Sequence, residues 1–117
     1  MDRPAGVTTL THPDMPDPSV LERIAERFRD AMKAERVVVF GSVARGQATI
    51  HSDIDLLVVA PSGESPYWRM ARARAAVRGL SHGLPLAPLV ITPSEVERRL
   101  RRGDHFLKEA FDEGIDL

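Results

Sequence analysis

Two apolar runs joined by a polar connection constrain the fold of this chain more than any other feature. The first run, residues 36–40, ends directly before Gly41-Ser42, and the second opens with Asp53-x-Asp55. Short runs rich in valine, isoleucine and leucine are typical of buried strands, so both predict strands in the interior of a sheet. Because side chains alternate along a strand, Asp53 and Asp55 point to the same side of the second one.

These residues suggest a metal–nucleotide site. Two neighbouring carboxylates repel each other unless a cation lies between them, and carboxylate oxygens suit Mg²⁺, which also takes substrate phosphates. The turn at Gly41-Ser42 offers backbone N–H groups and a hydroxyl to phosphate oxygens. We therefore predict Asp53 and Asp55 as metal-binding and catalytic residues, and Gly41 and Ser42 as nucleotide-binding. Arg45 fits either a phosphate contact or a solvated turn. The alternative for the acidic pair is a solvated strand edge.

The string GSVARGQATIHSDIDLLVV, residues 41–59, resembles the signature of the DNA polymerase β-type nucleotidyltransferase superfamily. It is most similar to the small MNT (minimal nucleotidyltransferase) proteins, many of which are antitoxins paired with HEPN-domain toxins. The resemblance covers roughly residues 19–117. It implies a nucleotidyltransferase fold in which the carboxylates bind Mg²⁺ and the serine binds the triphosphate of an NTP, with ATP as the first choice.

The resemblance also implies a reaction and a partner. A nucleoside monophosphate would be transferred to a hydroxyl of a partner protein. Because 117 residues are too few for both this domain and a helical toxin, a separately encoded HEPN-type toxin is expected as the partner.

One position departs from the family pattern. Family members that transfer nucleotides use a third carboxylate on the next strand, where this chain has Ala87, and no acid occurs between Leu84 and Ile91. An alanine can neither bind a metal nor accept a proton. The alternative function is therefore a catalytically impaired antitoxin, or a regulatory module that acts by direct contact. A weaker third reading, an RNA-binding module, rests only on arginine-rich helices.

The rest of the chain predicts one small α/β (α+β) domain in the order α-β-α-β-α-β-α-α, with a mixed sheet. Residues 1–18 form a proline-rich arm, and residues 19–117 form the domain. Helices are expected at 19–35, opened by a Ser19–Glu22 capping box, briefly after Ser42, and at 65–79, 93–103 and 104–113. A second capping box, Thr92–Glu95, is expected to open the helix at 93–103. Strands are expected at 36–40, 53–60 and 84–91, with Pro88 marking the last as an edge or bulged strand.

Composition adds limits. The net charge of −1 makes nucleic acid an unlikely partner, and the absence of cysteine excludes disulfides. No apolar run approaches the 18 or so residues of a membrane span, so a cytoplasmic location without membrane contact is expected. Met70, Ala73 and Val77 are predicted core residues, with Trp68 as a further candidate. His51 is read as an exposed loop residue, and the other histidines receive no role.

Overall fold

The computed structural model describes residues 16–49, 52–80 and 83–117. Its elements are α1 (Pro18–Met32), β1 (Arg36–Phe40), α2 (Gly41–Ala44), β2 (Ile54–Val59), α3 (Pro66–Ala76), β3 (Leu86–Ile91), α4 (Pro93–Arg101), α5 (His105–Glu113) and β4 (Ile115–Asp116). The predicted order of elements is confirmed, and β4 is an addition. The predicted arm is described only from residue 16 onward, and His12, His51 and His82 lie outside the described residues.

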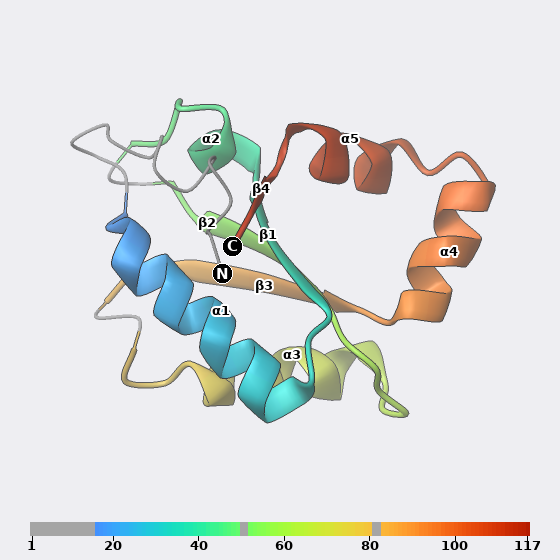
Figure 1. Ribbon diagram of the computed structural model, residues 1–117, viewed down its shortest axis with the longest axis horizontal. Helices are drawn as coiled ribbons and strands as arrows, with labels where there is room; N and C mark the ends of the chain where they lie inside the picture. Colours follow the sequence, from blue (N-terminus) through green and yellow to red (C-terminus); the bar gives the residue numbers. More distant parts are fainter. Residues whose placement is uncertain (1–15, 50–51, 81–82) are drawn as a thin grey trace.

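The four strands form one mixed sheet in the order β3-β2-β1-β4. β1 is antiparallel to both β2 and β4, whereas β2 and β3 are parallel. The mixed sheet is as predicted, and β3, which carries Pro88, is an edge strand as expected. Helices α1 and α3 lie on one face of this sheet and α5 lies on the other (Figure 1).

Alternation along β2 decides which residues face which helices. Leu56 and Val58 belong to the core under α1 and α3. Leu57 belongs to the second cluster, together with Leu107 and Ala110 of α5. Since Asp55 lies two residues before Leu57, its side chain is on the α5 face of the sheet. The candidate site therefore lies on that face.

The N-cap residue of helix α1 lies two residues earlier than predicted. Asp17, not Ser19, is the N-cap: its Oδ1 accepts from the Ser19 backbone N–H at 2.9 Å and from the Ser19 hydroxyl at 2.9 Å. The expected Ser19–Glu22 capping box is thus wrong, because Pro18 occupies the first helical position, which suits a residue without an N–H. The helix ends at Met32, before Lys33 in the left-handed conformation at φ 55°.

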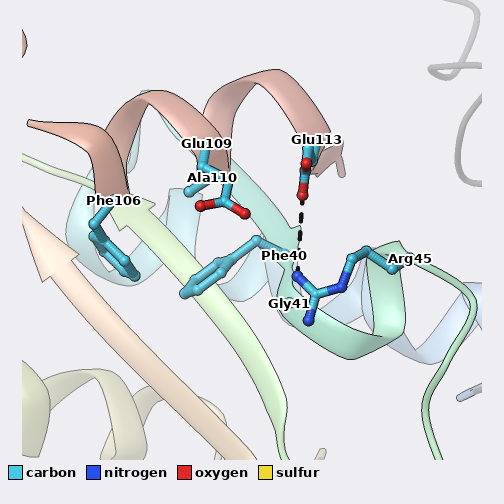
Figure 2. A pocket seen from close by; sticks show the side chains of 7 residues that line it. All are labelled: Phe40, Gly41, Arg45, Phe106, Glu109, Ala110 and Glu113. Atoms are coloured by element: carbon cyan, nitrogen blue, oxygen red, sulfur yellow. Dashed lines mark ion pairs between the residues drawn. The ribbon is translucent and has the colours of Figure 1, made fainter.

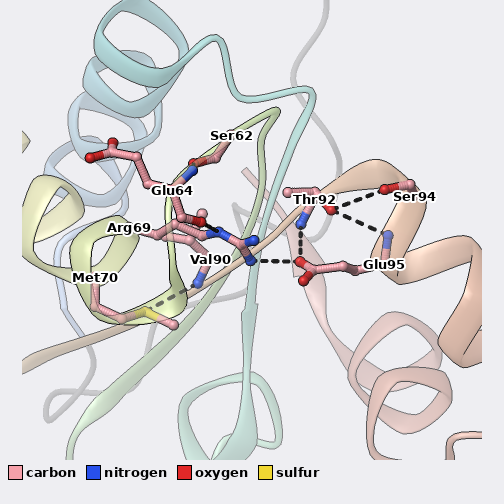
Figure 3. Close-up of polar contacts among 8 residues, drawn as sticks. All are labelled: Ser62, Glu64, Arg69, Met70, Val90, Thr92, Ser94 and Glu95. Carbon is pink, nitrogen blue, oxygen red and sulfur yellow. Dashed lines mark hydrogen bonds and ion pairs between the residues drawn. The ribbon is translucent and has the colours of Figure 1, made fainter.

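The predicted capping box at the start of α4 is confirmed. The Glu95 N–H donates to the Thr92 hydroxyl at 3.2 Å, and the Glu95 carboxylate accepts from the Thr92 N–H at 2.9 Å. The same carboxylate binds the Arg69 guanidinium of α3 at 2.6 Å, and Arg69 also donates to the carbonyl of Glu64 at 2.9 Å (Figure 3). These contacts fix the start of α4 against α3.

Helix α3 corrects one core prediction. Ala73 and Val77 are buried and Met70 packs against the core, but Trp68 is 56% exposed and forms an edge-on pair with the exposed Tyr67. Arg69 lies four residues before Ala73 and eight before Val77, so Arg69 and not Trp68 falls on the buried stripe. Over the residues that the structure describes, no helix is long and apolar enough to span a bilayer.

Candidate functional site

The turn after β1 brings the two halves of the central motif together. Phe40 pairs with Asp55 in the antiparallel register of β1 and β2, so Gly41 follows directly beside Asp55. Gly41 has φ +70°, which favours glycine. A Cβ atom at this position would collide with the Asp55 carboxylate. Backbone conformation and space therefore both require glycine here, and the turn approaches the carboxylate with no side chain between them.

The two aspartates lie at the start of β2. Asp55 is half-buried, whereas Asp53 precedes the strand and is exposed. Burial and, next, the charge of Asp53 raise the pKa of Asp55 above the ordinary 3.8, while Arg45 acts in the opposite direction. The two carboxylates are thus close enough to interact. Neither makes a hydrogen bond or ion pair with the described residues.

This donor set fits one magnesium ion. Mg²⁺ is usually held by one or two carboxylates, and the other positions are taken by water and substrate phosphates. Two unpaired acids beside a glycine turn offer that combination. Within residues 16–49, 52–80 and 83–117, no group of three or more potential ligands comes together. A metal held here would therefore take two carboxylates from the described part of the chain.

Ser42 and Arg45 flank the turn on α2. Ser42 is partly exposed in the first turn of this four-residue helix, and within the described ranges its hydroxyl has no hydrogen-bond partner. Arg45 is the C-cap residue, and its Nη1 lies 4.0 Å from Glu113 Oε2 of α5. Its positive charge therefore acts on Asp55, whose pKa it lowers, as well as on Glu113 in the last turn of α5.

The pairing of β3 with β2 shows where the third carboxylate of the family pattern would lie. Asp55 is the parallel partner of Ala87, so both side chains lie on the same face in adjacent strands. A carboxylate at position 87 would therefore lie beside Asp55. The methyl group present there supplies neither a metal ligand nor a proton acceptor.

Helix α5 adds a pocket that the sequence reasoning missed. Its volume is about 160 Å³, and it is lined by Phe40, Gly41, Arg45, Phe106, Glu109, Ala110 and Glu113 (Figure 2). The rings of Phe40 and Phe106 meet edge-on, with centroids 5.5 Å apart. The spacing of the four α5 residues places them on one helical face, which is a signal in the sequence. Their position over the end of β1 follows only from the tertiary fold.

Comparison with known proteins places the chain in a family. The model of the nucleotidyltransferase domain family matches residues 21–117, and the chain belongs to this family. Transfer of a nucleoside monophosphate is therefore the general class of reaction that it supports. No curated protein matches.

The fold is also found in a solved structure. A candidate nucleotidyltransferase from Sulfolobus solfataricus, known from a crystal structure at 1.40 Å, aligns with a TM-score of 0.55 and 24% identity, over 84% of each chain. At this identity the likeness concerns the fold.

Proposed function

We propose that this protein binds Mg²⁺ and an NTP, ATP in the first instance, and transfers the nucleoside monophosphate to a hydroxyl of a partner protein. The observation that carries the proposal is the close approach of Gly41 to Asp55, which places the backbone of the turn directly beside the two aspartates. Asp53 and Asp55 would hold the metal, which offsets the negative charge of the triphosphate. Ser42 and the backbone of the turn bind phosphate oxygens, and Arg45 assists by exchanging Glu113 for a phosphate.

The proposed partner is a separately encoded HEPN-type toxin, for which this chain serves as the antitoxin. Support comes from the resemblance of residues 41–59 to MNT proteins, in a chain that belongs to the nucleotidyltransferase domain family over residues 21–117.

A second candidate function is neutralisation of that partner by contact alone. It is favoured by one observation, the register that pairs Asp55 with Ala87 and leaves the third acidic position empty of a carboxylate. The two candidates share the fold and the nucleotide site, and they differ in whether label moves to the partner.

The test is a label-transfer assay. The protein, the purified HEPN-type partner, Mg²⁺ and ATP labelled at the α-phosphate are combined, and the protein bands are examined for label. The Asp53→Asn/Asp55→Asn double variant is the control. Label with the wild type only supports transfer. If the wild type leaves the partner unlabelled but the Ala87→Asp variant labels it, the protein is an impaired enzyme. If neither the wild type nor Ala87→Asp labels the partner, the contact antitoxin is favoured.

A further inference from the structure

The pocket between the β1–α2 turn and α5 opens beside the candidate nucleotide site and shares Gly41 with it. We propose that this pocket receives the acceptor hydroxyl and that Glu109 takes the proton from it. This inference rests on the proposed transfer reaction and assigns the group that performs the role left vacant at Ala87.

The chemistry of the transfer requires such a group. The acceptor oxygen forms a bond to the α-phosphorus, and the bond from that phosphorus to the α–β bridging oxygen breaks. Pyrophosphate leaves with the electron pair, and the proton of the hydroxyl must pass to a base. Asp53 and Asp55 would be engaged as metal ligands. Ala87, the neighbour of Asp55 in β3, has no basic group. The base must therefore come from another element that borders the turn.

Two carboxylates of α5 border it, and they differ in their contacts. Glu113 faces Arg45 at 4.0 Å. Among the residues that the structure describes, Glu109 makes neither an ion pair nor a hydrogen bond. Its carboxylate extends from α5 over the side chain of Phe40, toward the space that Gly41 borders (Figure 2). Glu109 is thus the available base of the pair.

The helix holds this carboxylate in place. Leu107, two residues before Glu109, and Ala110, the residue after it, are 0% and 4% exposed and are packed against Val38 and Leu57 of the sheet. The backbone that carries Glu109 is therefore anchored, while its side chain remains free to contact a substrate.

The pocket also indicates the class of acceptor. A volume of about 160 Å³ lies below the roughly 300–1,000 Å³ of sites for whole small molecules, so it suits one protruding side chain. Phe40 and Phe106 provide an apolar wall, and Glu109 places a negative charge at the rim, whereas the charge of Glu113 is offset by Arg45. The matching substrate is a hydroxyl-bearing side chain on a protein surface with positive charge nearby.

The experiment compares Glu109→Gln with Asp112→Asn in the label-transfer assay. Asp112 is on the same helix and does not line the pocket, so its variant is matched in charge and position. We expect Glu109→Gln to slow transfer about 100-fold or more, the usual effect of losing a general base. ATP binding, measured with a fluorescent ATP analogue, should stay within about twofold, and Asp112→Asn should behave as the wild type.

A second variant separates loss of a base from other damage. Ala87→Asp in the Glu109→Gln background should recover transfer at least about tenfold, because a carboxylate then stands beside Asp55. Undiminished transfer by Glu109→Gln, loss of ATP binding along with transfer, or a double variant no faster than Glu109→Gln each overturns the assignment. If the wild type itself transfers no label, the proposed transferase function fails first, and this inference fails with it.

Discussion

At the scale of single residues, Gly41 brings the backbone of the β1–α2 turn directly beside the Asp55 carboxylate. The sequence made this proximity predictable, because Gly41 directly follows one strand and Asp55 lies near the start of the next, and antiparallel pairing of the two strands brings them together. The roles of Ser42 and Arg45 stay predictions. The involvement of Glu109 could not be predicted, since nothing local relates α5 to the end of β1.

Two glycines offer a matched test of the turn. Gly41 and Gly46 both have φ +70°, but a Cβ atom meets the Asp55 carboxylate only at Gly41 and meets nothing within 4 Å at Gly46. Alanine at either position should cost about 1–2 kcal/mol of unfolding free energy through the left-handed conformation. Only Gly41→Ala should also abolish ATP binding. Denaturant unfolding and nucleotide titration measure the two effects, and equal binding by both variants would contradict the role of Gly41.

The ionised carboxylate of Asp55 should lower the stability of the folded protein, although the proposed metal site requires it. Burial and the charge of Asp53 raise its pKa above 3.8, so the folded state disfavours the ionised carboxylate. Its stabilising contribution is complete below pH 3.8 and is lost as the pH rises through the raised pKa. Asp55→Asn should therefore melt at a higher temperature than the wild type at pH 7, and the difference should shrink below pH 3.8. Melting curves across pH test this, with Asp112→Asn as control; a gain that does not depend on pH would refute it.

Binding of Mg²⁺ at Asp55 should, in contrast, raise the stability of the folded protein. An ion held between Asp53 and Asp55 offsets their repulsion and binds only the folded state, so added Mg²⁺ should raise the melting temperature of the wild type. Asp55→Asn should show a smaller rise. Equal shifts for both proteins at matched ionic strength would indicate that the ion binds elsewhere.

At the scale of elements, periodicity and capping signals in the sequence predicted most of the helices and strands, whereas one strand is defined only by its pairing. The helices and the three longer strands follow from their apolar patterns. β4 was missed because Ile115–Asp116 is too short to show alternation, and only its pairing with Val38 and Val39 of β1 makes it a strand. The wrong cap on α1 arose because two capping residues, Asp17 and Ser19, stand on either side of Pro18, which takes the first helical position and leaves Asp17 as the N-cap.

The start of α4 gives a prediction at this scale. Bonding to the Thr92 N–H and then to Arg69 lowers the pKa of Glu95 from 4.5 to about 2. The stabilisation is therefore present above pH 4.5 and is lost as the pH falls toward 2. Glu95→Gln should lower the unfolding free energy by about 1–2 kcal/mol at pH 7 and by less at pH 3.

The matched variant is Glu97→Gln. Glu97 pairs with Arg101 at 3.4 Å, but both side chains are more than 70% exposed, and such surface pairs contribute little. Denaturant unfolding at both pH values should separate the two glutamates. An equal loss in both variants would mean that the bonds from Glu95 to α3 and Thr92 add nothing.

At the scale of the whole molecule, α5 covers the face of the sheet that carries the candidate site, and β4 pairs with β1 at the edge of the sheet. Gly114 joins these elements where a Cβ atom would meet the carbonyl of Ala110 and the side chain of Val38. Gly114→Ala should destabilise the fold by about 1–3 kcal/mol, as overpacking does. Gly63→Ala, where nothing lies within 4 Å, is the control. Thermal and denaturant unfolding decide, and a neutral Gly114→Ala would show that β4 can shift without cost.

The edge strand β3 limits how the molecule can assemble. Bonds from Ile54 to Pro85 and from Ala60 to Ile91 show that the odd-numbered residues of this strand face β2, so residues 86, 88 and 90 present their backbone outward. The Leu86 N–H donates to the Leu84 carbonyl at 2.9 Å, Pro88 has none, and the Val90 N–H meets Met70 Sδ at 3.4 Å. These three positions offer no free donor to an incoming strand. Extension of the sheet by β-augmentation along β3 is thus disfavoured, because an incoming strand would find carbonyl acceptors but no free donors there.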